Sequence, residues 1–224
     1  QLDKEARRFP RSDALMFWQI AGVSHLVVHK HDLGKRARGI SRFLQEAPER
    51  YQLVTGDKEV DVYRLLPPST APELLTTPAL PQGATPITPR GATAKSNGSK
   101  AGGALDQAPG SSWRAKGLQR EGQWFQIDLG DEQDVVALEF ADHANVFDAP
   151  RAWRLELSAD GKAWTTAQEQ VNPALFAEQI HTPASFVFRV VLPEARRARY
   201  LRLSLLAPSQ TSHWVVHTAR VWAP

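Results

Sequence analysis

Hydrophobic and polar residues alternate along much of the second half of the chain. Residues 122–130 have the sequence GQWFQIDLG, in which Phe, Ile and Leu alternate with Gln and Asp between two glycines. A period of two is typical of a β-strand that has one face in a core. The alternation returns at residues 136–140, 153–157 and 201–205, with Gly, Pro or Asp between the segments. The pattern predicts a sandwich or barrel built around residues 122–130.

The series of predicted strands continues through residues 186–192, through 200–206, which includes the alternating segment 201–205, and through 214–222. Asp160-Gly161 supplies a hairpin turn between two of the strands. Short strands with turn residues every eight to twelve positions or so are typical of an antiparallel sandwich. No segment of helical period has convincing length here, so residues 82–224 are predicted to be all-β.

The first 66 residues alternate between element types. The pattern predicts a short helix over Ala14–Ile20, a buried strand over Ser24–His29 and a second helix that Asp32 caps. Two further strands, at residues 50–55 and 60–66, form a predicted hairpin. The second helix places five apolar residues on one face: Leu33, Ala37, Ile40, Leu44 and Ala47. These elements predict a small α/β subdomain whose marginal core needs a neighbour.

Seven prolines fall between residues 67 and 90. Proline at this density removes backbone donors and favours extended segments, so this stretch is predicted to be a linker or a strap that lies along a surface. The predicted organisation is therefore an α/β subdomain at residues 1–66, the Pro-rich linker or strap at 67–90 and a β-sandwich at 82–224.

Composition narrows the class of protein. The chain has 224 residues, 42% hydrophobic and 23% charged, which suits a globular protein of one large or two small domains. Its net charge of +3 includes no block of five or six like charges, so we expect no nucleic-acid partner. The absence of cysteine excludes disulfides and thiolate metal sites. The longest apolar run, Ala14–Val23, is too short to span a bilayer, and the start at Gln1 suggests a processed or excised chain.

Five motifs occur in order across residues 90–222: Ala104-Leu105-Asp106, Ser111-Ser112-Trp113, Gly122–Gly130, Leu157–Trp164 and Ala198–Leu203. Their order and spacing resemble the discoidin, or coagulation-factor type C, family, which includes many galactose-binding-like carbohydrate modules. The resemblance implies a jelly-roll β-sandwich, normally extracellular. It also implies that loops at one end bind a glycan or another surface ligand without catalysing a reaction.

The first subdomain carries a second, shorter resemblance. Gly22–His29, the helix after it and Val60–Leu65 are similar to the soluble tails that follow the last membrane span of some bacterial integral-membrane glycosyltransferases. This resemblance implies that the chain is the extracytoplasmic part of a membrane enzyme, periplasmic or at the cell surface. Its membrane-embedded catalytic domain would then lie upstream.

The discoidin resemblance also implies a structural calcium ion in the loop Asn97–Trp113. Asp106 and Ser111 stand where the carboxylate and hydroxyl ligands belong, whereas Gln107 replaces a glycine and Thr218 stands where a glutamate is expected. Because calcium takes about six to eight oxygen ligands, a site with one carboxylate binds it weakly. The alternative is that Asp106 caps a turn through its own backbone.

Sugar sites combine an aromatic ring that stacks on a pyranose with planar polar groups that contact its hydroxyls. Loop residues 143–151 and 211–214 concentrate such side chains, and so does the position after Trp113. Relatives often have histidine at that position, where this chain has Arg114, so the usual galactose specificity is not expected. The candidate carbohydrate-binding residues are Arg114, His143, Asn145, Phe147, Arg151, His213 and Trp214.

Two other groups of residues are expected to be structural. Trp153 and Trp164 lie on strand patterns, and we expect both in the core. His25, His29 and His31 would suit zinc, but no acid or base is paired with them, which favours a structural role. No Ser-His-Asp, paired-carboxylate or glycine-rich phosphate motif stands out. We therefore expect no enzyme activity within this chain.

The sequence leaves three hypotheses of function. The first is a non-catalytic carbohydrate-binding region that holds a cell-envelope polysaccharide near a membrane glycosyltransferase. The second is a jelly roll that docks on protein and has lost ligand binding, and the third is an accessory module of a secreted glycosidase. Burial of Phe147 and Trp214 against residues 1–80 would favour docking.

Overall fold

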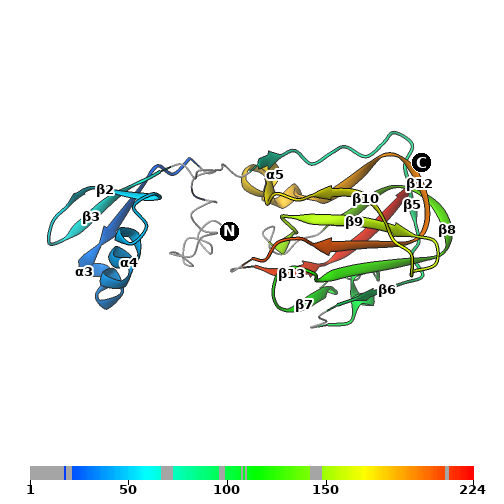
Figure 1. Ribbon diagram of the computed structural model, residues 1–224, viewed down its shortest axis with the longest axis horizontal. Coiled ribbons are helices and arrows are strands. Elements are labelled where there is room, and N and C mark those ends of the chain that lie inside the picture. The colour runs from blue at the N-terminus through cyan, green and yellow to red at the C-terminus, as the bar shows by residue number, and fades with distance from the viewer. Residues whose placement is uncertain are drawn as a thin grey trace. The chain divides into compact units, whose positions relative to one another are not determined.

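The computed structural model describes residues 18, 22–66, 73–95, 99–106, 108, 110–141, 148–209 and 212–224. The chain divides into two compact units, Gln1–Pro72 and Glu73–Pro224 (Figure 1). Each unit has its own sheet and core. The helix predicted over Ala14–Ile20 lies outside the described residues except for Trp18, which is helical.

The first unit is a small α/β fold. Its elements are β1 (His25–His29), α3 (Lys30–Leu33), α4 (Lys35–Gln45), β2 (Tyr51–Gly56) and β3 (Val60–Leu65). Among the described residues, the three strands form an antiparallel sheet in the order β1-β3-β2. The predicted apolar helix face is confirmed, because Ala37 and Leu44 of α4 share a buried core with Val28 and Tyr63 of the sheet.

Two details of this unit differ from the sequence prediction. The predicted helix is broken at Gly34, whose φ of 52° and ψ of −126° lie outside the helical region, so Asp32 lies inside α3 and caps nothing. Strand β1 is not buried throughout. Val28 faces α4 and is buried, whereas Val27 on the opposite face is 53% exposed. The apolar run therefore marks a strand with one covered face.

The predicted hairpin between β2 and β3 is confirmed, and polar side chains hold its turn. The carboxylate of Asp57 accepts two hydrogen bonds from backbone N–H groups of the turn, at 2.7 and 2.8 Å. Asp61 is 6% exposed, and its carboxylate contacts the ammonium of Lys30 at 2.7 Å and the hydroxyl of Ser41 at 3.0 Å. Asp61 therefore ties both helices to the sheet.

The second unit is a β-sandwich, which confirms the predicted fold class. Its elements are β4 (Glu73–Leu75), β5 (Thr85–Ile87), β6 (Gly91–Ala94), η1 (Ala101–Ala104), β7 (Trp113–Leu118), β8 (Trp124–Ala141), β9 (Trp153–Ser158), β10 (Thr165–Gln170), β11 (Ala174–Phe176), α5 (Ala177–His181), η3 (Pro183–Ser185), β12 (Phe188–Leu205), β13 (His213–Val216) and β14 (Thr218–Ala223). Within the described residues, seven strands make an antiparallel sheet in the order β10-β9-β12-β8-β14-β5, with β6 beside β8. Two smaller sheets pair β13 with β7 and β11 with β4.

Alternation along β8 builds the core as predicted. Phe125, Ile127 and Leu129 are buried, while Gln126 and Asp128 lie on the other face and are half-buried. Packed aromatic rings continue this core, with centroids 5.1 Å apart from Trp113 to Phe125, 5.8 Å from Phe125 to Phe140 and 5.6 Å from Phe140 to Phe188.

The boundaries of several strands differ from the prediction. Residues 124–130 of the first predicted strand and residues 136–140 belong to one strand, β8, because the exposed residues between them stay extended beside β12. The segments predicted at 186–192 and 200–206 likewise fall largely within the single strand β12. The segment 214–222 contains two strands, β13 and β14, which separate at His217.

One predicted core residue lies elsewhere. Trp153 is buried as expected, but Trp164 is half-buried on the outer face of the large sheet. There the guanidinium of Arg202 lies 3.8 Å from the centroid of the Trp164 ring and 4.7 Å from that of Trp124. Desolvation by these rings and the sheet lowers the pKa of Arg202. Trp164 therefore stacks on a cation and contributes nothing to the core.

Part of the Pro-rich stretch belongs to the sandwich. From Glu73 onward it lies along the second unit: β4 pairs with β11 and β5 pairs with β14. Between these strands, the carboxylate of Glu178 accepts hydrogen bonds from Thr77, and Arg189 donates one to the carbonyl of Pro78 at 2.8 Å. Residues 73–90 are therefore a strap on the sandwich surface.

Candidate functional site

The two ends of the sandwich are set by β9. This strand has six residues, so at about 3.3 Å per residue its ends lie roughly 16 Å or more apart. Residues 148–152 precede β9, and the described residues 206–209 and 212–213 form a second segment, which joins them through the hydrogen bond from the N–H of Leu206 to the carbonyl of Ala152. We call these two segments the loop end. Residues 158–165, between β9 and β10, form the hairpin end.

Two of the predicted carbohydrate-binding residues are buried. Trp214 is fully buried, and its ring packs edge-on against Trp113 with centroids 5.0 Å apart. Arg151 is 8% exposed. A buried ring offers no face to a pyranose, and burial likewise removes Arg151 from the accessible surface, so this structure favours neither residue as a sugar contact. Trp214 instead extends the aromatic core.

Arg114 and His213 are accessible, and both lie on the small sheet formed by β7 and β13. Arg114 is exposed opposite Val215, whereas His213 is half-buried opposite Leu118. These two pairings lie four positions apart along β7 but only two positions apart along β13, because the register shifts between His213 and Val215. The structure therefore places the two candidates on one ribbon but at separate points along it. Lys116, also exposed, lies between them and makes this face of the ribbon basic.

Hydrogen bonds fix the backbone of Arg114. Its N–H donates to the hydroxyl of Ser99 at 2.8 Å, and its carbonyl accepts from the N–H of Ser99 at 3.2 Å. The Ser99 hydroxyl also contacts the carbonyl of Ser112 at 3.2 Å. The side chain of Arg114 thus extends from a backbone that Ser99 holds through both its N–H and its carbonyl. His143, Asn145 and Phe147 lie outside the described residues, and their predicted role stays a prediction.

Two of the three predicted calcium ligands, Asp106 and Ser111, contact each other in the described part of the loop. Both carboxylate oxygens of Asp106 accept hydrogen bonds from the loop itself, from the N–H of Ala108 at 3.0 Å and the hydroxyl of Ser111 at 2.8 Å. These bonds, the backbone one first, lower the pKa of Asp106. Thr218 is buried at the start of β14. Across the described residues, no three His, Cys, Asp or Glu side chains are grouped, the predicted histidines included. This donor set fits a self-capped turn better than resident calcium.

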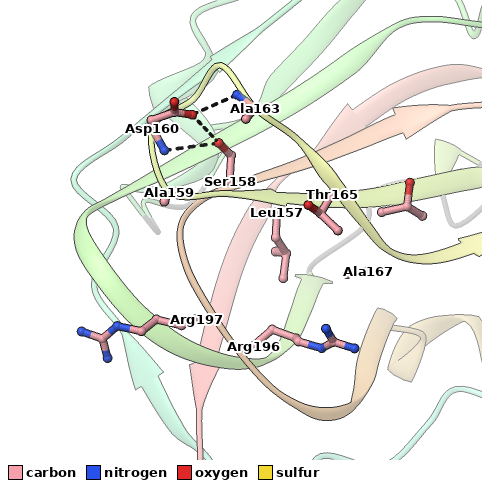
Figure 2. A pocket seen from close by; sticks show the side chains of 10 residues that line it. Leu157, Ser158, Ala159, Asp160, Ala163, Thr165, Ala167, Arg196 and Arg197 are labelled. Atoms are coloured by element: carbon pink, nitrogen blue, oxygen red, sulfur yellow. Dashed lines mark hydrogen bonds between the residues drawn. The ribbon is translucent and has the colours of Figure 1, made fainter.

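The hairpin end contains an open cavity of about 470 Å³ (Figure 2). Leu157 lies at its buried wall, and the turn beside it is fixed by Asp160, whose carboxylate accepts hydrogen bonds from the N–H groups of Lys162 and Ala163. Those bonds lower the pKa of Asp160. Arg196 and Arg197 line the other side, and none of the described lining residues is aromatic.

The charges at the rim of this cavity are already paired. Arg196 contacts Glu194 at 2.9 Å, and Arg197 contacts Glu132 at 3.5 Å and Asp134 at 3.9 Å. An acidic ligand would have to displace these carboxylates. The cavity therefore lacks both the aromatic platform and the uncompensated charge that would favour a sugar.

A family model described as the F5/8 type C domain matches residues 90–219, more than half of the chain. The chain belongs to this family. All five motifs that carry the discoidin resemblance lie within the matched residues, and the matched residues lie within the second unit. No curated protein matches the chain.

Several solved structures are similar to this F5/8 type C domain. CpGH89CBM32-5 from Clostridium perfringens, in complex with GalNAc-β-1,3-galactose, is 15% identical with a TM-score of 0.50, over 62% of this chain and 100% of that chain. The family 32 CBM of NanJ from C. perfringens, in complex with galactose, is also 15% identical, with a TM-score of 0.49 over 62% and 98%. A truncated AlyQ with CBM32 and alginate lyase domains is 16% identical, with a TM-score of 0.49 over 62% of this chain and only 33% of its own. Such identities show the fold alone.

Sequence reasoning missed one residue of the F5/8 type C domain that shapes the loop end. Gln119 directly follows β7 and is 2% exposed. Its side-chain amide contacts the carbonyl oxygens of Asp148, Ala149 and His213. A single glutamine after a strand carries no pattern in the sequence, so only the long-range contacts identify it.

Proposed function

We propose that the second unit is a non-catalytic carbohydrate-binding module whose glycan lies along the β7–β13 ribbon. Membership of the F5/8 type C family carries this proposal. The complex of GalNAc-β-1,3-galactose with CpGH89CBM32-5, which has the same fold, supports it. Arg114, Lys116 and His213 supply donors and acceptors on an accessible face, and the two cations favour an acidic glycan over a neutral one.

We further propose that the chain is the extracytoplasmic part of a bacterial membrane glycosyltransferase and holds a cell-envelope glycan near its active site. The similarity of Gly22–His29 and Val60–Leu65 to the tails of such enzymes supports this context. The catalytic domain would lie in the membrane, upstream of this chain. In the part of the chain that the structure describes, no helix is long and apolar enough to cross a bilayer.

Affinity electrophoresis through gels that contain a polysaccharide tests the first proposal. The panel comprises alginate and polygalacturonate as acidic polymers, galactan as a neutral one, and a bacterial cell-envelope polysaccharide preparation. We expect an acidic or cell-envelope polymer to retard the chain. Arg114→Ala should weaken binding about tenfold or more, the loss of one charge-assisted contact of roughly 1.4 kcal/mol or above.

Arg154→Ala is the matched control. Arg154 lies on the outer face of the large sheet, where it pairs with Glu169 at 2.8 Å. Its loss should leave retardation unchanged. Equal effects of the two variants would mean that the ribbon is not the site, and no retardation by any polymer would count against carbohydrate binding itself.

Protein docking remains the second candidate function. Two features favour it: Arg114 stands where relatives often have histidine, and Trp214 is buried, so the usual histidine is absent and the ring of Trp214 is not accessible to a sugar. Trp214, however, is buried against Trp113 of its own unit, so its burial reflects core packing. Docking would be favoured if the gels showed no retardation while the isolated chain bound the membrane-embedded domain.

A further inference from the structure

Gln119 is the point at which three parts of the sandwich meet. Its side-chain nitrogen lies 3.1 Å from the carbonyl oxygen of Asp148, 3.3 Å from that of Ala149 and 3.1 Å from that of His213. Its own N–H donates to the carbonyl of Ser212 at 2.9 Å, and its carbonyl accepts from the N–H of Ser209 at 3.1 Å. One buried residue therefore binds both segments of the loop end.

These contacts act on chain segments that are far apart in sequence. Residues 148–149 precede β9, whereas Ser209, Ser212 and His213 follow β12, so about 60 residues separate the two segments. If an apolar group replaces a buried amide that donates to carbonyl oxygens, those oxygens lose the hydrogen bonds that the amide supplied. The loop end therefore depends on a single side chain for part of its geometry.

The ring of His213 is oriented by a second contact. Its Nδ1 lies 2.6 Å from the carbonyl oxygen of Gly117. Because a carbonyl only accepts hydrogen bonds, Nδ1 must carry the proton. In the neutral ring, Nε2 is then an acceptor. Gln119 holds the backbone of His213 and Gly117 holds its ring, so both the position and the tautomer of this half-buried histidine are fixed.

We infer that Gln119 is a positioning residue of the glycan site and acts through His213, whose Nε2 accepts a hydrogen bond from a sugar hydroxyl. This inference rests on the proposed function. It assigns the loop end of the ribbon to a hydroxyl of the glycan and the Arg114 end to its acidic group. A rigid acceptor discriminates well, because a sugar that lacks the matching hydroxyl leaves it without a partner.

The test uses the whole chain and the polysaccharide that retards it most in the panel above. Gln119→Met keeps the length of the side chain and removes its donors. We expect this variant and His213→Ala each to weaken binding about tenfold. Because Gln119 acts through His213, the double variant should bind no more weakly than His213→Ala alone. Additive losses would overturn the inference.

Two further measurements separate positioning from a general loss of structure. In Gln119→Met, hydrogen exchange should accelerate at the amides of Ser209 and at residues 148–149 and 212–213, while amides of Phe125–Leu129 stay protected. Gln126→Met is the matched control, since Gln126 lies on the outer sheet face and contacts Arg202. It should leave binding unchanged.

Each outcome of these measurements decides the inference. If Gln119→Met binds as the wild type does while the wild type binds well, the inference fails and the proposed function stands. If acceleration of exchange spreads to Phe125–Leu129, the residue supports the whole sandwich and the positioning role is overturned. If the wild type binds no polymer, both the proposed function and this inference fail.

Discussion

Glu139 offers the sharpest test of what holds the sandwich together. Its side chain is 4% exposed in the middle of the large sheet, directly opposite Arg189 of β12 and Arg220 of β14. The carboxylate accepts hydrogen bonds from Arg189 at 2.7 and 2.9 Å and from Arg220 at 2.9 Å. Arg189 also holds the strap through the carbonyl of Pro78. One carboxylate thus links three strands and the strap.

Glu139→Ala should destabilise the sandwich strongly. Removing one partner of a buried ion pair typically costs about 3–5 kcal/mol, because the remaining charge stays desolvated. The side chain of Arg189 is 17% exposed and that of Arg220 is 33% exposed, so water can reach the second one and the lower value applies. We expect a loss of about 3 kcal/mol, or roughly 6–12 °C in Tm for a domain of this size.

Urea unfolding followed by tryptophan fluorescence measures this loss. Six of the seven tryptophans lie in the second unit, so the signal reports mainly on the sandwich. Glu132→Ala is the matched control, because Glu132 makes an exposed pair with Arg197 at 3.5 Å, and such pairs contribute less than about 1 kcal/mol. If Glu139→Ala shifted the midpoint no further than Glu132→Ala does, the triad would contribute nothing and the reasoning would be refuted.

Three further predictions concern other parts of the molecule. Gly56→Ala should destabilise the first unit by about 1–3 kcal/mol, because the new methyl group would collide with the buried carboxylate of Asp61. Gly39→Ala is the control: nothing lies within 4 Å of the new methyl group, so this variant should stabilise α4 by about 0.5–1 kcal/mol. Equal melting temperatures of the two variants by circular dichroism would contradict both expectations. Hydrogen bonds from Arg199 are the main cause that lowers the pKa of Asp128 in the folded protein. The ionised carboxylate therefore stabilises the fold above the unfolded pKa of about 4, and this contribution is lost as the pH falls through the lower folded pKa. Urea midpoints should therefore drop below about pH 4, less steeply in Asp128→Asn, and parallel curves would argue against this source. Millimolar calcium should raise Tm by no more than about 1 °C over EDTA, because the loop offers the single carboxylate of Asp106; a rise of several degrees would reveal a stronger site.

Local alternation predicts the strands well because one face of each strand must be apolar. It placed Phe125, Ile127 and Leu129 in the core and identified the covered helix face at Ala37 and Leu44. The same pattern says little about what covers a face. The apolar run of β1 predicts a buried strand, yet only a helix on one side is present among the described elements, and Val27 is 53% exposed.

Residues of the candidate site are harder to predict because their environment comes from distant segments. Trp214 follows polar loop residues, so the sequence suggests an accessible ring, and only the contact with Trp113, about 100 positions earlier, buries it. The prediction for Trp164 is wrong in the opposite direction. The sequence suggests a core residue, whereas its ring is half-buried and contacts Arg202 of another strand. Gln119 has no local signal at all. Each of these assignments depends on tertiary contacts that no local pattern contains.

The two ends of the sandwich differ in how their geometry is maintained, and this difference favours the loop end as the binding end. At the hairpin end, Asp160 closes its own turn with hydrogen bonds to the next few residues, and the nearby arginines are paired with carboxylates. A ligand there would have to break existing ion pairs. At the loop end, Gln119 holds two distant segments, and the contact with Gly117 leaves one ring nitrogen of His213 as an acceptor. A pre-positioned acceptor loses little entropy when a ligand binds, so the loop end can provide specificity at a lower cost.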